Sequence, residues 1–375
     1  MICRRFSLKC SLLSFFLMLF VASPLVAQDD EQLRRDIGEM LLVGFRGQSV
    51  DASPHLRRDI QQYHVGAVIL FEYDAPSGTR HRNIASPAQL RSLCQQLQQL
   101  SPSEPLLIGI DQEGGKVCRM RAVDGFPRIA SPRQTALGGP DSVRHYARLT
   151  AQMLQRAGVN FNYAPVADVN VNPACPVIGK LERSFSSDTD EVASCCRIWL
   201  QELGRHGVIG CLKHFPGHGS ASADTHKGLV DVSRTWQPYE LAPYRILMAH
   251  EQVPAVMVAH VINSRIDSLW PASLSQATVT GLLRNQMGFD GVIVTDDLAM
   301  GAIIHHYDFE TVIFQAIHAG SDLLCLSNNG TNGYNPDIVP QTVDIILRLV
   351  ADGRLSADRI HESAERVRKL KKTLK

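Results

Sequence analysis

The chain has 375 residues, of which 45% are hydrophobic, so it can build one large core or two ordinary domains. Its 38 Lys and Arg residues nearly balance its 37 Asp and Glu residues. Proteins that bind nucleic acids usually carry a basic excess or a basic patch. The sequence has neither, so we expect no nucleic-acid partner.

The N-terminus has the pattern of a secretory signal peptide. Basic residues among the first nine precede an apolar run at 10–22, and the chain turns polar after residue 27. The apolar run is short for a membrane-spanning helix, which makes an uncleaved anchor the less favoured alternative. We therefore expect a signal peptide at 1–27 and a single domain at 28–375. The mature chain would have no membrane span and would be exported, either to the periplasm or out of the cell.

Eight short apolar runs recur along the chain, each rich in Val, Ile, Leu or Phe. They lie at residues 41–45, 65–71, 105–110, 159–169, 208–212, 254–261, 291–295 and 322–327. Near-continuous apolar runs of this length are typical of parallel strands that are buried on both faces. We expect each run to form one strand of a parallel sheet.

Segments with helical spacing lie between these runs, at 86–100, 141–158, 189–207 and 277–288. Glycines that tolerate the left-handed conformation close several helical segments, at Gly158, Gly207, Gly288 and Gly320. This alternation predicts an α/β fold with a single (β/α)₈ barrel. An open doubly wound sheet is the alternative, but no GxGxxG turn follows the first run. The segment from residue 356 predicts one extra amphipathic helix outside the barrel.

The seven cysteines after residue 27 have neither CxxC spacing nor a zinc pattern. Because their number is odd, at least one is unpaired within the chain. Cys211 and Cys325 lie inside strand-like runs, and we expect both to be buried as small hydrophobic residues. The sequence does not determine which of the others form disulfides.

Polar residues follow the ends of five consecutive predicted strands. They are Asp111, Asp168, the pair Lys213-His214, His260, and the pair Asp296-Asp297. Catalytic groups in such a barrel come from the carboxyl ends of its strands. One such residue alone could be a hydrogen-bonded structural group. A set at one end of the barrel, where burial is costly, indicates a functional cleft.

Carboxylates in a cleft favour sugar hydrolysis. The transition state needs a carboxylate beside the anomeric carbon and a proton donor for the leaving oxygen. Asp296 can supply the carboxylate, but no second acid is an obvious donor. Histidine can donate the proton because its pKa lies near neutrality. The candidates are His214, His218, His226 and His260.

The glycine-rich segment 213–228 follows the fifth predicted strand. Asp224 and His226 alternate by two, so in an extended segment they would point the same way, and the Asp could orient the His. A metal site built from His214, His218, Asp224 and His226 is an alternative, as is a purely structural loop. Because the intervals do not match the helical His spacing of common zinc hydrolases, we expect no metal and no cofactor.

Two segments resemble glycoside hydrolase family 3, specifically its bacterial β-N-acetylglucosaminidase branch. One is KHFPGHG followed by Asp224-Thr225-His226, the other is GFDGVIVTDDLAM at 288–300, and the resemblance runs from about residue 36 to 330. It implies that Asp296 is the nucleophile and that His226, paired with Asp224, is the acid/base of a retaining mechanism. It also implies a sugar pocket. The implied binding residues are Asp111, Arg119, Arg183, Lys213 and His214.

The resemblance implies a carbohydrate substrate with terminal β-linked N-acetylglucosamine, such as a peptidoglycan fragment. Lys116 stands where the family usually has arginine, the loop after the second strand is longer, and the large second domain of many members is absent. For Arg183 the alternative is an ion pair on a helix surface. Activity on β-glucosides, phosphate in place of water, and a sugar-binding barrel without turnover are open alternatives. The sequence does not determine the oligomeric state.

Overall fold

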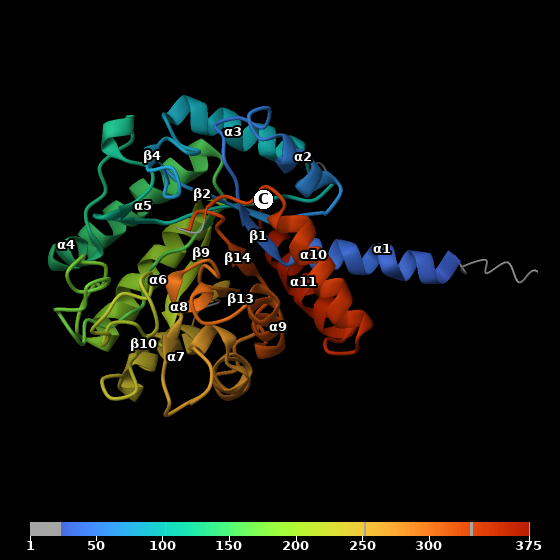
Figure 1. The fold of residues 1–375 in the computed structure, drawn as a ribbon. Helices are drawn as coiled ribbons and strands as arrows, with labels where there is room; N and C mark the ends of the chain where they lie inside the picture. Colours follow the sequence, from blue (N-terminus) through green and yellow to red (C-terminus); the bar gives the residue numbers. More distant parts are fainter. Residues whose placement is uncertain (1–23, 102, 251–252, 331–332, 375) are drawn as a thin grey trace, which may run out of the picture.

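The computed structural model of the protein describes residues 24–101, 103–250, 253–330 and 333–374 (Figure 1). An eight-stranded parallel sheet forms its centre, in the order β13-β11-β9-β8-β5-β2-β1-β14. A bridge between Val294 and Leu323 joins the two ends of the sheet, which curves into a barrel. The strands are β1 (Leu41–Gly44), β2 (Ala67–Leu70), β5 (Leu107–Ile110), β8 (Phe161–Asn162), β9 (Ile209–Phe215), β11 (Ala255–Val258), β13 (Val292–Thr295) and β14 (Leu324–Leu326). The predicted (β/α)₈ barrel is confirmed. Each predicted run coincides with one of its strands, although β9 continues three residues beyond the predicted end at 212.

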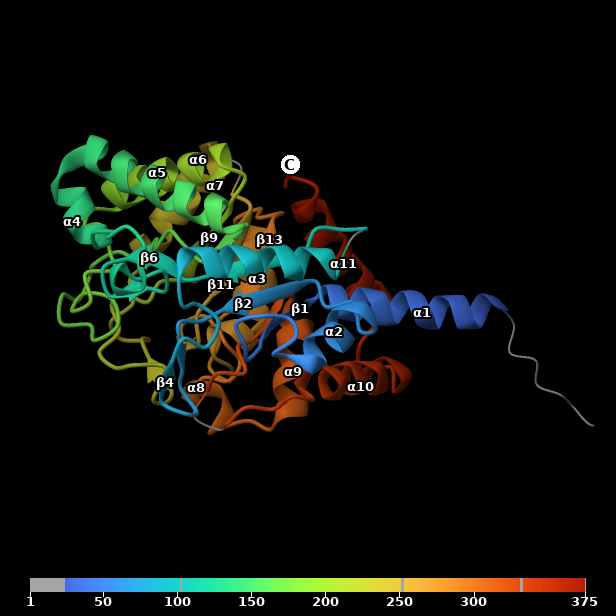
Figure 2. The same ribbon diagram turned by 90° about the horizontal axis from the view of Figure 1, so that it is seen from above.

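Helices surround the strands (Figures 1 and 2). They are α2 (Pro54–Gln61), α3 (Pro87–Gln99), α4 (Pro132–Leu137), α5 (Gly139–Ala157), α6 (Thr189–Arg205), α7 (Ala242–His250), α8 (Gly301–Ile304), α9 (Phe309–Ala319) and α10 (Ile338–Ala351). The predicted helical segment 277–288 is a π-helix, η4 (Ala277–Gln286). Short 3₁₀ turns lie at η1 (Ala122–Asp124), η2 (Pro238–Leu241) and η3 (Ala272–Leu274). All four predicted closing glycines have positive φ, from 68° at Gly207 and Gly288 to 114° at Gly320, as expected.

The strands bury both of their faces. In β1, Leu41 and Val43 join the larger core cluster, whereas Leu42 between them joins a second, smaller cluster. Successive strand residues point to opposite faces, so one set fills the barrel and the other packs under the helices. Cys211 and Cys325 belong to the smaller cluster, which confirms their expected burial. The seven cysteines of the described residues are all free thiols.

The loops that follow the strands carry small paired segments. The loop after β2, expected to be long, contains the hairpin β3 (Tyr73–Asp74) and β4 (Thr79–Arg80). The loop after β5 contains β6 (Gln112–Gly114) and β7 (Val117–Cys118). The loops after β9 and β11 pair through β10 (Val230–Asp231) and β12 (Val261–Ile262). Pairing of this kind orders the loops on which catalytic residues of such barrels are found.

The two ends of the described chain pack against each other. Helix α1 (Pro24–Glu39) lies beside α11 (Ala357–Lys371), the predicted extra C-terminal helix (Figure 1). Glu39 Oε1 lies 2.5 Å from Lys371 Nζ, and Arg368 pairs with Asp36. The predicted signal peptide lies outside the described residues except for 24–27, which open α1. Within the part of the chain that the structure describes, no helix is both long and apolar enough to span a membrane.

Candidate active site

A cavity of about 510 Å³ lies where the strands end and their loops begin. Every site residue predicted from the sequence lines it: Asp111, Arg119, Arg183, Lys213, His214, Asp224, His226 and Asp296. The eight residues come from loops or strand ends that are up to 185 positions apart, from Asp111 to Asp296. The barrel therefore brings into one cavity all eight residues that were predicted separately from the ends of different strands.

The floor of the cavity carries paired charges. Lys213 Nζ donates to Asp111 Oδ1 at 2.6 Å, and Arg119 Nη2 donates to Asp111 Oδ2 at 3.2 Å. Burial alone would raise the pKa of the Asp111 carboxyl, but Lys213 and Arg119 hold that pKa well below its usual range. Asp111 is therefore a fixed anion whose remaining lone pairs can accept hydrogen bonds from a ligand.

Glu113 is a member of this network that the sequence analysis missed. Its two carboxylate oxygens each accept from Arg183, both at 2.7 Å, and Oε1 also lies 2.7 Å from Lys213 Nζ. Since Glu113 is 1% exposed and Arg183 lies in the loop before α6, the alternative of a surface ion pair on a helix is wrong for Arg183. The sequence feature that could have identified Glu113 is its place as the second acid of the DQEGG segment.

His214 is held by a buried carboxylate. Its Nδ1 lies 2.7 Å from Asp168 Oδ2, and its Nε2 lies 3.2 Å from Arg183 Nη2. Burial would raise the pKa of Asp168, but the adjacent His214 lowers it. Both ring nitrogens of His214 are engaged, so this histidine is fixed in orientation and is a poorer candidate for proton transfer to a ligand.

Asp296 and Asp297 follow β13, and the structure distinguishes them. The Asp297 carboxylate accepts from both the backbone nitrogen and the hydroxyl of Ser327. Asp296 Oδ1 accepts only from the Asp297 backbone nitrogen, at 2.8 Å, among the described residues. Burial would raise the pKa of Asp296, but His260 and His214 bring it below its usual value. Asp296 is thus an anion with an accessible oxygen, which a nucleophile requires.

His260 does not have a free ring nitrogen. Its Nδ1 lies 2.6 Å from Ser273 Oγ and its Nε2 lies 2.9 Å from the Asp297 carbonyl oxygen. Burial lowers its pKa. His260 therefore supports the loop that carries Asp296, and is not available to protonate a leaving group.

Asp224 and His226 form a dyad at the mouth of the cavity. Asp224 Oδ1 lies 2.8 Å from His226 Nδ1 and accepts from the His226 backbone nitrogen at 2.9 Å. The expected extended segment is wrong, because Lys227 N donates to the Asp224 carbonyl and closes a turn. The turn nevertheless brings the two side chains together. His226 is 66% exposed, and its Nε2 has no hydrogen-bond partner among the described residues.

Of the four candidate histidines, His226 is therefore the one best placed for proton transfer. Burial lowers the pKa of the fourth, His218, to about 4, so it is neutral near pH 7. In the described part of the chain, no group of three or more His, Cys, Asp or Glu side chains converges in the way that metal ligands do.

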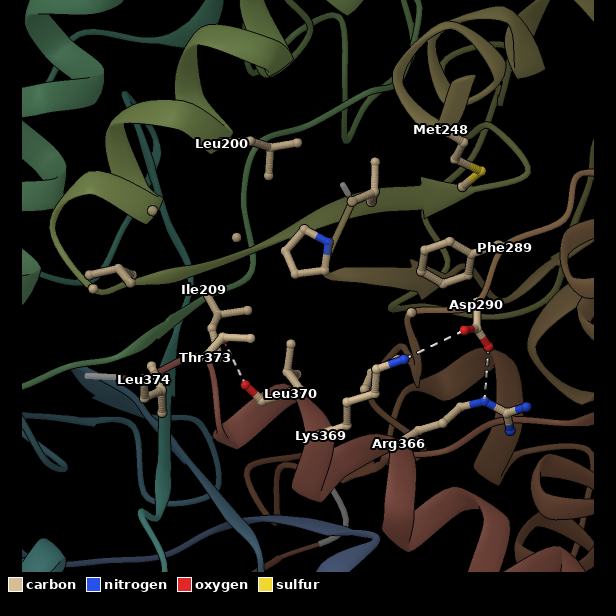
Figure 3. Close-up of a pocket in the computed structure, with 18 of the residues that line it drawn as sticks. Leu200, Ile209, Met248, Phe289, Asp290, Arg366, Lys369, Leu370, Thr373 and Leu374 are labelled. Carbon is tan, nitrogen blue, oxygen red and sulfur yellow. Dashed lines mark hydrogen bonds and ion pairs between the residues drawn. The ribbon is translucent and has the colours of Figure 1, made fainter. Parts of the chain in front are cut away.

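Another cavity, of about 470 Å³, lies at the opposite end of the barrel (Figure 3). The first residues of β9 and β13 line it, together with α11 and apolar side chains such as Phe289. Asp290 pairs there with Lys369 and Arg366, at 3.8 and 3.9 Å. None of the predicted site residues lines this cavity, and enzymes with this fold place their active sites at the other end.

Comparisons with known proteins agree with this geometry. Residues 32–370 match the family described as "Glycosyl hydrolase family 3 N terminal domain". A beta-hexosaminidase of Thiobacillus denitrificans is 36% identical over 289 residues, which are 73% of this chain and 74% of the relative. Beta-hexosaminidase A of Pseudoalteromonas piscicida is 31% identical, over 90% of this chain and 60% of the relative.

Solved structures show the same fold. A glycoside hydrolase family 3 β-N-acetylglucosaminidase from Paenibacillus sp. superposes with a TM-score of 0.80 at 35% identity, over 91% of this chain and 62% of that one. A β-N-acetylhexosaminidase from Beutenbergia cavernae superposes with a TM-score of 0.78 at 27% identity, over 91% of this chain and 98% of that one. The chain belongs to glycosyl hydrolase family 3 and is related to beta-hexosaminidases over about three quarters of its length.

Proposed function

We propose that the protein is a retaining exo-glycosidase that removes terminal β-linked N-acetylglucosamine from glycans such as peptidoglycan fragments. One observation carries the proposal: an anionic Asp296 and an exposed His226–Asp224 dyad line the same cavity. The relatives named beta-hexosaminidase and β-N-acetylglucosaminidase support the choice of sugar. The charge pattern of residues 1–27 supports export to the periplasm or out of the cell.

In the first step, an Asp296 carboxylate oxygen attacks the anomeric carbon and forms a covalent glycosyl-enzyme. The bond to the leaving oxygen breaks, and His226 Nε2 delivers its proton to that oxygen. In the second step, His226 removes a proton from water, whose oxygen attacks the anomeric carbon and releases Asp296. Two displacements at one carbon retain the anomeric configuration. Asp224 holds the orientation of the His226 ring through Nδ1 and leaves Nε2 to face the leaving oxygen.

The paired charges of the cavity floor would bind the terminal sugar. Asp111 accepts hydrogen bonds from hydroxyl groups, whereas Lys213, Arg119 and Arg183 donate to ring substituents. Arg119 lines the cavity, and its guanidinium has donors besides the one that bonds to Asp111.

The test is hydrolysis of 4-nitrophenyl β-N-acetylglucosaminide beside 4-nitrophenyl β-glucoside. We expect faster release from the first substrate and a loss on the order of 10⁴-fold or more in Asp296→Ala. Asp290→Ala, at the opposite end of the barrel, is the matched control and should keep full activity. Equal activity of Asp296→Ala and wild type would refute the assignment of Asp296 as the nucleophile. Faster hydrolysis of the glucoside would refute the proposed preference for N-acetylglucosamine.

His226→Ala tests the acid/base separately. General acid catalysis contributes about 10²–10⁴-fold, and mainly where the leaving group is poor. We expect the variant to lose more activity on an alkyl N-acetylglucosaminide than on the 4-nitrophenyl substrate. Appearance of N-acetylglucosamine 1-phosphate in phosphate buffer would instead favour the phosphorolytic alternative, and loss of activity with chelator would favour a metal hydrolase.

A further inference from the structure

A small cavity lies on the flank of the barrel, between the neighbouring helices α3 and α5 (Figure 1). Its volume is about 290 Å³, near the lower end of the range of about 300–1,000 Å³ that small-molecule pockets occupy. The start of α3, the second half of α5 and the segment Phe126-Pro127 form its walls. Among the described residues none lines both this cavity and the active-site cavity. The flank cavity therefore has space for one small molecule, which would not touch the catalytic groups.

Apolar side chains form much of the lining of the flank cavity. Phe126 and Met153 are buried, and Leu149, Pro87 and Pro127 lie around them. An apolar group that covers such side chains is removed from water together with them, which is favourable. The flexible side chain of methionine can also adapt to the shape of a ligand. The lining therefore favours a ligand with an apolar body.

Two exposed arginines complete the lining. Arg91 belongs to α3 and Arg156 to α5. In the described part of the chain, neither guanidinium takes part in an ion pair or a hydrogen bond. Of the residues that the structure describes, none that lines the cavity is acidic. The flank cavity thus offers two cationic groups without a compensating anion.

The sequences of the two helices explain why these arginines have no partners. Helix α3 contains no Asp or Glu, and the one acid of α5, Asp141, lies at the opposite end of the helix from Arg156. The other arginines of α5, Arg144 and Arg148, pair with Glu202 of α6, at 3.3 and 3.1 Å. Arg156 differs from them, because it lines the cavity beside α3. Its charge is therefore available to a ligand.

The third wall of the flank cavity leads to the active site. Phe126 N donates to the carbonyl oxygen of Arg121 at 3.3 Å, and Arg121 lines the active-site cavity. Asp124, which lies between them in the sequence, accepts from Arg80 at 3.0 Å and does not line the flank cavity. A ligand that packs against Phe126 would therefore contact a segment that is hydrogen-bonded to the rim of the active site.

We propose that the flank cavity binds a small carboxylate with an apolar body, such as an aromatic acid. The carboxylate would accept charge-assisted hydrogen bonds from Arg91 and Arg156, whose guanidinium groups present several donors in a fixed plane. The apolar body would cover Phe126 and Met153. A bare anion would leave these side chains uncovered, and a neutral apolar molecule would leave both cations without a partner. The inference does not depend on the proposed function, because no catalytic residue lines this cavity.

Isothermal titration calorimetry of the full chain with four probes tests this chemistry. The probes are benzoate, benzamide, acetate and inorganic phosphate. At low ionic strength we expect one benzoate to bind with a Kd roughly tenfold below that of neutral benzamide, since a hydrogen bond to a charged group is stronger than one to a neutral group. Acetate lacks the apolar body and should also bind roughly tenfold more weakly than benzoate. The difference between benzoate and benzamide should shrink in about 0.5 M NaCl, because exposed charges are screened.

Variants of the two arginines locate the site. Arg91→Gln and Arg156→Gln should each raise the Kd of benzoate roughly tenfold, since each removes one charged donor. Both residues are exposed, so neither change should alter the fold. Arg34→Gln, which removes an exposed base on α1 outside the cavity, is the matched control and should keep the wild-type Kd.

Four results would overturn the proposal. Benzamide that binds as tightly as benzoate would show that the arginines do not hold a carboxylate. Acetate or phosphate that binds as tightly would show that the apolar lining contributes nothing. Benzoate that binds equally to the wild type and to both arginine variants would lie elsewhere on the protein. The proposal would also fail if no benzoate bound at concentrations up to about 10 mM. None of these results bears on the proposed function, which the 4-nitrophenyl substrates test separately.

Discussion

His218 Nε2 lies 3.2 Å from Thr225 Oγ1, and both side chains are buried. Thr225 stands between Asp224 and His226 in the sequence, and its carbonyl oxygen accepts from Ala302 N. His218 is itself fixed, because its backbone nitrogen donates to Asp168 Oδ1 at 2.8 Å. The hydrogen bond between His218 and Thr225 therefore connects the exposed Asp224–His226 dyad to the buried floor of the cavity.

Thr225→Val removes the hydroxyl and keeps the shape of the side chain. We expect a loss of about tenfold in kcat on substrates with poor leaving groups, because a buried ring nitrogen without a partner costs about 1–3 kcal/mol and frees the loop that positions His226. Substrates with good leaving groups should be affected less. Thr225→Ser should restore most of the activity. An equal loss on both kinds of substrate, or no rescue by Ser, would mean that Thr225 is only a folding residue.

The strands and the end of the barrel that carries the site could be predicted because burial on both faces leaves a continuous apolar run. The same runs end at Asp111, Lys213 and Asp296, so the site followed from the strands. Helix η4 was expected as an ordinary α-helix, since apolar spacing does not distinguish it from a π-helix.

The contacts that fix the site could not be predicted in the same way. Asp168 and Glu113 contact residues that are 46 or more positions away in the sequence, as in the hydrogen bond between Asp168 and His214. His218 contacts Thr225 through a turn of the loop. One sequence gives residue types and local spacing, but not which distant groups meet in space. The dyad of Asp224 and His226 was expected for the wrong local reason, because a turn and not an extended segment joins them.

Glu113→Gln should weaken both folding and sugar binding. The variant leaves the buried cations Lys213 and Arg183 with one fewer anion, and breaking a buried ion pair costs about 3–5 kcal/mol. We expect a lower unfolding midpoint in urea and a higher KM for 4-nitrophenyl β-N-acetylglucosaminide. Glu365→Gln, which removes an exposed partner of Arg368, is the control and should change stability by no more than about 0.5 kcal/mol. A midpoint as high as that of the control would contradict the role of Glu113.

Glu240 should make the stability of the loop that carries Asp224 and His226 depend on pH. A side chain at Gly217 would come within 2.9 Å of Glu240, so this buried carboxyl packs directly against the loop. Burial and, to a smaller extent, the negative charge of Asp168 raise the pKa of Glu240 from 4.5 to about 7, although the hydrogen bond from Gln237 N to Oε1 opposes this shift. The folded protein therefore favours the protonated form. Its stabilising contribution is full below pH 4.5 and is lost as the pH rises through about 7.

Glu240→Gln imitates the protonated carboxyl at every pH. We expect its melting temperature to exceed that of the wild type by a few degrees at pH 8, and by little or nothing at pH 4.5. The measurement is thermal unfolding of both proteins across this range. Parallel curves for the two proteins would show that the pKa of Glu240 is the same in the folded and unfolded states, and would contradict the shift.

The ion pair between Glu39 and Lys371 should account for much of the contact between α1 and α11. Both side chains are at least 94% buried, and Lys371 Nζ lies 2.5 Å from Glu39 Oε1. Lys371→Met leaves a buried carboxylate without its cation, so we expect a loss of about 3–5 kcal/mol in the free energy of unfolding near pH 8. Burial already raises the pKa of Glu39, and Lys371 opposes this shift. Without Lys371 the carboxyl takes up a proton more readily, so the loss should shrink as the pH falls toward 5.

The double variant Glu39→Leu/Lys371→Met separates the ion pair from simple packing. It buries no unpaired charge, so it should be more stable than Lys371→Met alone, with a coupling energy of about 0.5–3 kcal/mol in the double-mutant cycle. Urea unfolding of the wild type, both single variants and the double variant gives that energy directly. If the two single effects simply add, Glu39 and Lys371 do not stabilise each other, and apolar packing and the Arg368–Asp36 ion pair hold the helices together.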